Sequence, residues 1–375
     1  MKTRIGILST MKMNEIEYTV DHPEPASGIL ETSRSGWAPQ LQPSGRCLCA
    51  ELQSLTDSLS GMIDQESGAY RPCEDYFSQV MASSMAGPDL ICEAWRRKLC
   101  EWCYAIVDHY NLDRDVVFYA INYLDRTVAE KLKCSCAVTS QQYQLYTLSS
   151  LYLAFKLHGG VNSGTGQRVI PHINDFVGWS QGVFMEDLIW ETEWDILKSL
   201  SWRVSPPTVT CYISTLLRIC LISTIQKNIL LSAQVINEIL DTSRYVAELA
   251  VCISSLAFQY KTSTTAYACV LYALNVLPIN MSLPKHVLDV FTNSLRESAG
   301  FQPDDPQVKK VYTLLQELHT SVTSAILRGK TKQLKTGASV YAIDDNETAA
   351  HSSTRDNSEP SPKRIRSQKL SVKAK

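Results

Sequence analysis

Helical periodicity over residues 90–110 constrains the fold of this chain more than any other feature of its sequence. The stretch LICEAWRRKLCEWCYAIVDHY places Trp95, Leu99, Trp102 and Ile106 at successive spacings of four, three and four residues. These spacings put the four side chains on one face of an α-helix, which turns once in about 3.6 residues. The segment is therefore predicted to be an amphipathic helix with two bulky tryptophans on a single face.

Two further helices are predicted after this one. The first begins at Asp113, where an acidic residue suits the positive end of the helix dipole, and runs through VVFYAINYLDRTVAE. Thr139 or Ser140 can cap the second, QQYQLYTLSSLYLAFKLHGG. This helix is predicted to stop at the glycines of residues 159–160, because glycine readily takes the left-handed conformation that ends helices.

The rest of the chain continues the helical pattern and divides near residue 205. A short helix is predicted over residues 173–179, and a longer one, GVFMEDLIWETEWDILKSLSW, is ended by two prolines. Helical segments of similar length follow, from TVTCYISTLLRICLI to DPQVKKVYTLLQELHTSVTSAIL. The sequence predicts an all-α protein with two five-helix domains in tandem, over residues 71–204 and 205–327.

Both ends of the chain are predicted to be disordered. Residues 1–70 carry Pro, Ser, Gly and Thr without sustained periodicity, so they are not expected to bury enough apolar surface to offset the entropy of ordering. Residues 328–375 become polar and basic. Ser361 opens SPKRIR, which fits a proline-directed kinase site inside a basic cluster that fits a nuclear import signal. The expected location is nucleus and cytoplasm, and phosphate would neutralise part of the cluster's charge.

Composition argues against several classes of function. A net charge of −2 disfavours a general nucleic-acid binder, whose affinity depends on clustered Lys and Arg. The twelve cysteines are expected to be reduced and the compartment intracellular, since the chain is long and begins without an apolar leader. The most apolar window, residues 208–225, contains Arg218 and is a poor membrane span, so no membrane partner is expected.

Two short motifs are weighed against enzymatic chemistry. Cys100 and Cys103 form CxxC, and Cys134 and Cys136 form CxC, but the first pair fits a helical pattern and buried cysteine is common in cores. The Gly-rich loop GGVNSGTGQR lacks the GK[ST] ending that cradles phosphates. No metal, cofactor or catalytic residue is predicted.

Several spaced elements resemble the cyclin box. The stretch WRRKLCEWCYAIVDHYNLDRDVVFYAINYLDR, residues 95–126, matches without a gap, and WDILKSLSW and PPT follow at the expected places. The resemblance covers about residues 73–204 and extends to the second domain through helix count and YVAELAVCISSLAFQY. It implies that both domains have the cyclin fold and is nearest to plant D-type and diatom-type cyclins. The first 70 residues contain no RxxL pattern, which favours a G1/S-like cyclin over a mitotic one.

The resemblance implies two kinds of site. Arg96 and Asp125 should form a buried ion pair that is architectural, the alternative being that Asp125 is solvated or caps a helix end. Lys156 and Glu193 should contact the mobile regulatory helix of a kinase at the edge of an apolar surface. Spacing alone favours a different interpretation, in which Lys156 compensates the dipole at the end of its helix and Glu193 lies on a solvated face. The residues expected to supply that apolar area are Leu153, Leu157, Trp194 and Leu197.

A docking groove for substrate peptides is also implied, on Trp95, Leu99, Trp102 and Gln144. Two neighbours depart from the family pattern, because Lys98 replaces an apolar residue and Ala105 replaces an acid. Weak or altered docking is therefore expected, and a purely core role for the two tryptophans stays equally open. A further departure is Leu-His-Gly after Lys156, where relatives usually have an aromatic residue and two acids.

The function implied by the resemblance is that of a non-catalytic regulatory subunit. It would bind and activate a cyclin-dependent serine/threonine protein kinase in the cell cycle, with kinase substrates or inhibitors as further partners. The alternative is a transcription-related scaffold of the same fold that binds DNA or transcription proteins. That alternative requires a basic face within residues 73–330. An enzyme that uses the CxxC or the Gly-rich loop is a second rival.

Overall fold

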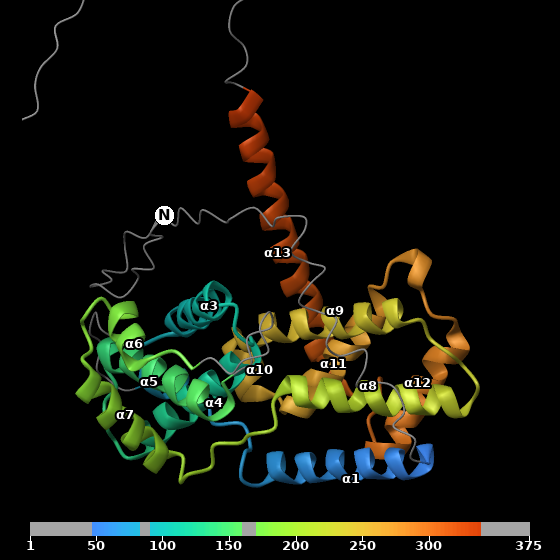
Figure 1. Cartoon of the computed structure of the whole chain (residues 1–375), viewed down its shortest axis with the longest axis horizontal. Coiled ribbons are helices and arrows are strands. Elements are labelled where there is room, and N and C mark those ends of the chain that lie inside the picture. The colour runs from blue at the N-terminus through green and yellow to red at the C-terminus, as the bar shows by residue number, and fades with distance from the viewer. Residues whose placement is uncertain (1–46, 83–90, 160–169, 339–375) are drawn as a thin grey trace, which may run out of the picture. The chain divides into compact units, whose positions relative to one another are not determined.

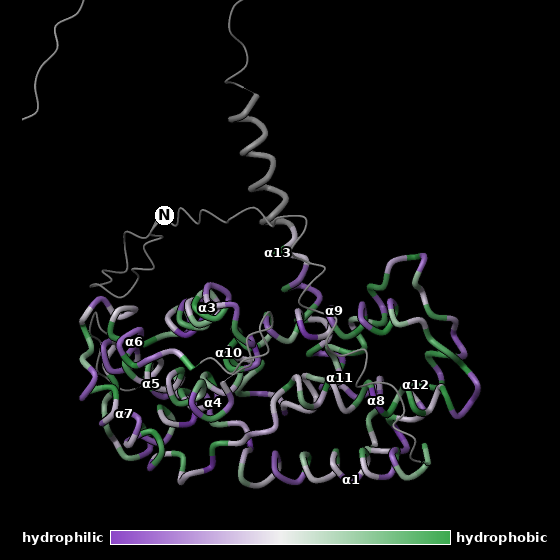
Figure 2. Tube along the Cα trace, in the orientation of Figure 1, coloured by the Kyte–Doolittle hydropathy of each residue, from purple (hydrophilic) through white to green (hydrophobic). Residues whose placement is uncertain are grey.

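The computed structural model describes residues 47–82, 91–159 and 170–338, with the backbone alone over 324–338. Within these ranges the regular elements are all helices, so the prediction of an all-α fold is confirmed (Figure 1). Figure 2 shows hydrophilic and hydrophobic residues alternating along them, as amphipathic helices require. The chain divides into two compact units, Met1–Val322 and Thr323–Lys375. The contacts below all lie in the first unit.

The first group of helices surrounds one hydrophobic core. Trp95, Leu99, Trp102 and Ile106 all lie in this core, as the spacing predicted. Thr139 caps α5 through its hydroxyl, and Gln142 returns a side-chain bond to the Thr139 backbone, forming a capping box. The helices are α2 (Tyr76–Ala82), α3 (Glu93–His109), α4 (Asp115–Lys133), α5 (Ser140–His158), α6 (Ile173–Trp179) and α7 (Glu186–Ser199).

The second group of helices surrounds a second core. At its centre lies α8, which is long and apolar enough to be a candidate membrane span, yet 61% of that window is buried among neighbouring helices. Its apolar character is that of a core helix. The elements are α8 (Val209–Gln226), α9 (Ala233–Val251), α10 (Ser254–Gln259), α11 (Thr262–Asn275), the 3-10 turn η2 (Ile279–Met281), α12 (Lys285–Ala299) and α13 (Pro306–Ala338).

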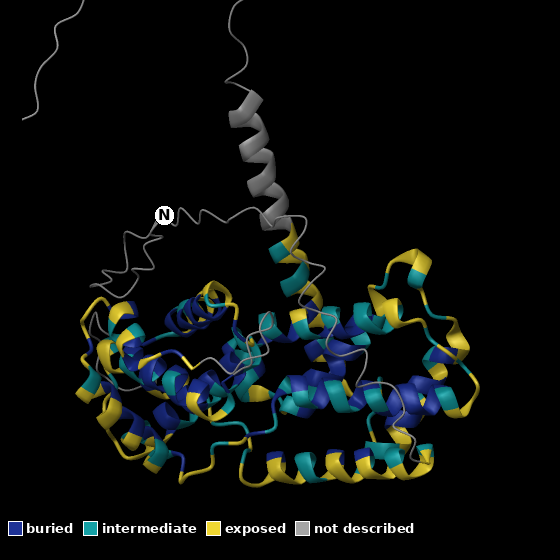
Figure 3. Ribbon diagram, in the orientation of Figure 1, coloured by how far each residue is buried: buried dark blue, intermediate teal, exposed yellow. Residues whose placement is uncertain are grey.

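Helix α1 (Leu48–Ser67) corrects the prediction that residues 1–70 are disordered. It packs beside α8 and α12 of the second group, although it precedes the first group in the sequence (Figure 1). Leu55 and Leu59 point into the second core, and Figure 3 shows the opposite side of the helix exposed. Residues 1–46 lie outside the described part of the chain.

Helix α13 also runs further than predicted. It continues to Ala338, so the prediction of a disordered tail from residue 328 is wrong for its first part. The basic cluster and Ser361 lie outside the described residues, as does the Gly-rich loop over residues 160–169.

The structure corrects two other details. Helix α4 continues to Lys133, so NYLDR lies within the helix and Asp125 does not cap its end. Gly159 follows α5 with φ −54° and ψ 131°, which is not left-handed. Glycine is needed there for space, because a Cβ atom would lie 1.8 Å from the Phe155 carbonyl oxygen.

Charged contacts join the two groups of helices. The Arg114 guanidinium lies 2.9 Å from the Glu248 carboxylate, and Arg244 lies 2.9 Å from Asp115. Both contacts run between α9 and the start of α4. They hold α9 of the second group against the start of α4 in the first group.

Candidate functional site

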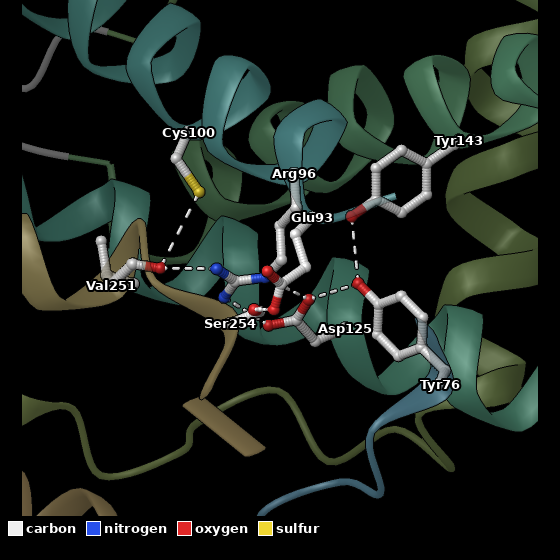
Figure 4. Close-up of polar contacts among 8 residues, drawn as sticks. All are labelled: Tyr76, Glu93, Arg96, Cys100, Asp125, Tyr143, Val251 and Ser254. Carbon is white, nitrogen blue, oxygen red and sulfur yellow. Dashed lines mark hydrogen bonds and ion pairs between the residues drawn. The ribbon is translucent and has the colours of Figure 1, made fainter. Parts of the chain in front are cut away.

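A buried ion pair joins α3 to α4. Arg96 donates from Nε to Asp125 Oδ1 at 2.9 Å and from Nη2 to Oδ2 at 2.8 Å, so both carboxylate oxygens are held by one planar fork (Figure 4). Both residues are buried. The structure thus brings together the two residues that the resemblance paired. Asp125 is not exposed to solvent and does not cap a helix end.

Two tyrosines complete the network around Asp125. The Tyr76 hydroxyl donates to Asp125 Oδ1 at 2.8 Å and lies 3.0 Å from the Tyr143 hydroxyl (Figure 4). Burial raises the pKa of both tyrosines well above the usual range, and the Asp125 charge adds to the shift. Burial alone would lower the pKa of Arg96, but the Asp125 carboxylate raises it well above its usual value. Tyr76 and Tyr143 therefore stay neutral, and Arg96 stays positively charged, at physiological pH.

Arg96 also reaches the second group of helices. Its Nη1 donates to the Val251 carbonyl at the end of α9 at 2.7 Å, and its guanidinium lies 5.5 Å from the centroid of the Phe258 ring. Nearby, the Ser254 hydroxyl donates to Glu93 of α3 (Figure 4). The network therefore ties the two helical groups together, which is an architectural role.

A second ion pair lies at the surface between α5 and α7. Lys156 Nζ is 2.5 Å from Glu193 Oε1, and the ammonium sits 5.1 Å from the centroid of the Tyr152 ring. The Lys156 side chain is 41% exposed, whereas that of Glu193 is only 10% exposed. The Lys156 ammonium is therefore accessible to a partner, whereas the Glu193 carboxylate that pairs with it is mostly buried.

Apolar side chains surround this pair. Leu157 and Trp194 are exposed, Trp194 at 53%, and Leu197 is half-buried against the first core. Leu153 differs from the prediction because it is buried in the core and offers no accessible area. We call Lys156, Leu157, Glu193, Trp194 and Leu197 the α5–α7 face.

One large contributor to this face was missed from the sequence. Trp202 is 59% exposed and packs against Trp194 edge-to-face, with ring centroids 5.3 Å apart. Its backbone and that of Ser201 are left-handed, at φ 61° and 50°. The short segment after α7 therefore turns back so that Trp202 meets the helix. The sequence offered one indication of this contribution, the tryptophan in LSWRV, but the position of its ring depends on the conformation of the turn.

Family comparison agrees with this geometry. Residues 57–205 match the family model for the cyclin N-terminal domain. This is a cyclin-family protein. The matched region contains both ion pairs and the α5–α7 face.

Curated relatives of this cyclin include cell-cycle cyclins of two types. Cyclin-A1-2 of Arabidopsis thaliana is 23% identical over 148 residues, which cover 40% of this chain and 29% of the relative. The G1/S-specific cyclin-E of Hemicentrotus pulcherrimus is 27% identical over 128 residues, covering 34% of this chain and 27% of the relative. The matches thus span under a third of these relatives.

Among solved structures, a viral cyclin from herpesvirus saimiri aligns with 61% of this chain and 87% of its own. The alignment has a TM-score of 0.45 and 14% sequence identity.

The residues predicted to form a docking groove in this cyclin have little accessible surface in the structure. Trp95, Leu99, Trp102 and Gln144 are all buried, and the first three belong to the first core. This burial favours the core interpretation of the two tryptophans. The Trp102 Nε1 donor is buried without a hydrogen-bond partner among the described residues.

His158 is one of the residues at which the sequence departs from the pattern that the resemblance implied. Its Nε2 lies 2.8 Å from both the Tyr123 hydroxyl and the Val204 carbonyl, and its ring stacks on Tyr119 at 3.6 Å between centroids. Burial lowers the pKa of His158. The neutral imidazole therefore donates to the Val204 carbonyl and holds the segment after α7 next to the end of α5.

The CxxC and CxC pairs of this cyclin have different surroundings. Cys100 and Cys103 are buried inside α3, whereas Cys134 and Cys136 are exposed after α4. The described part of the chain holds no group of three or more His, Cys, Asp and Glu side chains arranged to hold a metal ion. Burial raises the pKa of the Cys100 and Cys103 thiols, which disfavours the thiolate that zinc needs.

Proposed function

We propose that this cyclin binds a cyclin-dependent serine/threonine protein kinase as a regulatory subunit and activates it. The observation that carries the proposal is the α5–α7 face, where an ion pair is set among exposed apolar side chains. An apolar centre with charges that fix register is the anatomy of a binding hot spot. Activation follows if the kinase's regulatory helix is bound better in its active position than in its inactive one.

Exposed tryptophan area supports this surface as a binding surface. Trp194 and Trp202 form one aromatic pair, and Lys198 lies 5.8 Å from the centroid of the Trp194 ring. Tryptophan in a desolvated pocket is among the residues that contribute most to interfaces. The catalytic groups, ATP and magnesium would come from the kinase, so the chain itself is proposed not to be an enzyme.

The test exchanges the charges of the pair. The double variant Lys156→Glu/Glu193→Lys keeps an ion pair within the chain but reverses the sign of the charge at each of the two positions that face the kinase helix. Kinase retained from an extract of the source organism, and its activity on a histone peptide, are expected to fall at least tenfold, about 1.4 kcal/mol or more. Immunoblotting for cyclin-dependent kinases and a phosphorylation assay of the eluate measure both.

A matched control uses another ion pair of α7. Lys131 lies 2.6 Å from Asp195, and exchanging these two charges alters the same helix outside the α5–α7 face. The control is expected to retain kinase at the wild-type level. Equal retention by both variants would contradict the proposed interface, and absence of kinase with folded wild type would favour the scaffold alternative.

The proposed cell-cycle phase is G1/S, supported by the absence of RxxL from the first 70 residues. The named relatives are a G1/S-specific cyclin-E and one A-type cyclin. The nearer likeness to plant D-type and diatom-type cyclins stays a prediction. Kinase substrates or inhibitors are proposed as further partners.

Nuclear and cytoplasmic location is proposed from SPKRIR at residues 361–366. Phosphate on Ser361 would neutralise part of the basic cluster and weaken import. The variant Ser361→Ala is therefore expected to shift a fluorescent fusion toward the nucleus, whereas Ser361→Glu shifts it toward the cytoplasm. An unchanged nuclear fraction in both variants would count against control by Ser361.

A further inference from the structure

A basic pocket lies within the first group of helices, apart from the α5–α7 face. Its volume is about 390 Å³, and three segments line it: residues 71–74, the second half of α4, and residues 199–203, which begin at the last residue of α7. The charged residues that line it are Arg71, Glu74, Arg126, Glu130, Lys133 and Arg203. Four cations against two carboxylates give the pocket a net formal charge of +2.

Three of the cations are exposed. Arg71, Lys133 and Arg203 all face solvent. Within the described ranges, none of the three forms an ion pair with Asp or Glu, which sets them apart from Arg96, Arg114 and the other paired cations. Like charges gathered in one concavity repel one another, and an anion bound among them would relieve that repulsion.

The fourth cation is fixed in place by the backbone. Arg126 donates from Nη1 to the Arg203 carbonyl at 2.8 Å and lies 5.2 Å from the centroid of the Tyr70 ring. The Tyr70 hydroxyl in turn accepts from the Ser205 amide at 3.3 Å. These contacts hold the three walls together, so the pocket is preorganised and binding would cost little ordering entropy.

Arg126 is half-buried without a carboxylate partner among the described residues. Burial lowers the pKa of its guanidinium, and the neighbouring Arg203 charge acts in the same direction. The carbonyl oxygens it binds satisfy donors but supply no negative charge. A dianion would therefore stabilise this group as well as the three exposed cations.

We propose that this pocket binds a phosphate monoester on serine or threonine of a partner protein. Guanidinium groups match phosphate oxygens in charge and in fork geometry, and clusters of arginine are the usual means of reading a phosphorylated peptide. This inference does not depend on kinase binding by the α5–α7 face.

Charge decides between occupants. A nucleic-acid strand needs a continuous basic track, whereas the four cations here line one pocket that also contains Glu74 and Glu130. The chain's own Ser361 is a poor occupant, because residues 361–375 carry six Lys and Arg residues and no acid. A phosphorylated segment with neutral or acidic flanks fits the pocket best.

The experiment measures fluorescence polarisation with the full chain. The probe is a labelled peptide library with phosphoserine at its centre and degenerate flanks, compared with the same library carrying serine. Phosphoserine is expected to tighten binding about tenfold or more. The double variant Arg71→Ala/Arg203→Ala is expected to remove that gain, because it deletes two exposed cations but leaves the Arg203 carbonyl that holds Arg126.

The matched control removes two exposed cations outside the pocket, as Arg97→Ala/Lys285→Ala, so net charge changes equally. Its binding is expected to equal that of the wild type. Equal affinity for both libraries would overturn the proposal, as would equal loss in the two double variants. A labelled single-stranded oligonucleotide that binds more tightly than the phosphoserine library, with the same dependence on Arg71 and Arg203, would overturn it in favour of nucleic acid.

Discussion

Replacing Arg96 with alanine is expected to lower the free energy of unfolding by about 3–5 kcal/mol. The substitution leaves the Asp125 carboxylate buried without its counter-charge, since Tyr76 supplies only one neutral donor. It also leaves the Val251 carbonyl without its bond to the guanidinium. Domains are typically stable by about 5–15 kcal/mol, so this one change removes a large share of stability.

Urea unfolding followed by tryptophan fluorescence measures this effect where it arises. Six of the seven tryptophans lie between residues 95 and 202, so their emission reports mainly on the first group of helices. Far-UV circular dichroism follows both groups. The two signals are fitted separately, because two packed helical groups need not unfold in one step.

A double-mutant cycle separates the ion pair from simple loss of packing. Arg96→Met and Asp125→Ala each break the pair alone, whereas Arg96→Met/Asp125→Ala removes both charges, and Met keeps part of the Arg96 volume in the single and the double variant alike. The double variant is expected to be less destabilised than the two single losses added together, because no charge is left buried. Tyr76→Phe, which keeps the ring, should cost about 1–3 kcal/mol. Strict additivity in the cycle, or a loss under about 1 kcal/mol for Arg96→Ala, would refute the coupling.

Helices were predictable wherever the apolar period was sustained. The stripe from Trp95 to Ile106 located α3, and Thr139 located the start of α5, because periodicity and capping are local properties. The predicted conformation of the glycine that follows α5 was wrong. Gly159 was assigned a left-handed conformation when the actual constraint is the nearby Phe155 carbonyl, which only the folded turn reveals.

Contacts between distant segments could not be derived from residue patterns. The resemblance supplied the pairing of Arg96 with Asp125, but nothing in it placed the Val251 carbonyl, 155 residues away, beside the same guanidinium. The basic pocket could not be predicted for the same reason, because its cations come from three segments that are separate in the sequence and meet only in the folded chain. Burial also depends on packing, which explains why Leu153 was expected at the surface and lies in the core.

Helix α1 shows a signal that was present in the sequence but outweighed by composition. Leu48, Leu52, Leu55, Leu59 and Met62 recur at spacings of four, three, four and three residues, which is helical periodicity. The surrounding Ser, Thr and Gly residues favoured disorder. The helix persists because its stripe is covered by α8, so its stability comes from tertiary packing more than from helix propensity.

Replacing Leu59 with alanine is therefore expected to lower the free energy of unfolding by about 2–5 kcal/mol, the usual cost of a cavity in a core. Leu59 is fully buried between α1 and the second group of helices. Ser58→Ala is the matched control, since Ser58 is exposed on the other side of the same turn and should change stability by less than about 0.5 kcal/mol. Equal stability of the two variants would mean that α1 is not part of the folded core.

A polar contact makes the same dependence testable without a cavity. Glu66, near the end of α1, is 1% exposed and accepts from the Ser263 amide at 2.9 Å and from its hydroxyl at 2.6 Å, at the start of α11. At the start of α11, a carboxylate accepts from backbone amides that have no partner within the helix and lies at the positive end of the helix dipole. Glu66→Ala should thus cost about 1–3 kcal/mol by orphaning these donors. In Glu66→Ala, amide hydrogen exchange should rise in the first turn of α11, which loses its bonds to the carboxylate. In Leu59→Ala, exchange should rise across α1, which loses its anchor in the second core.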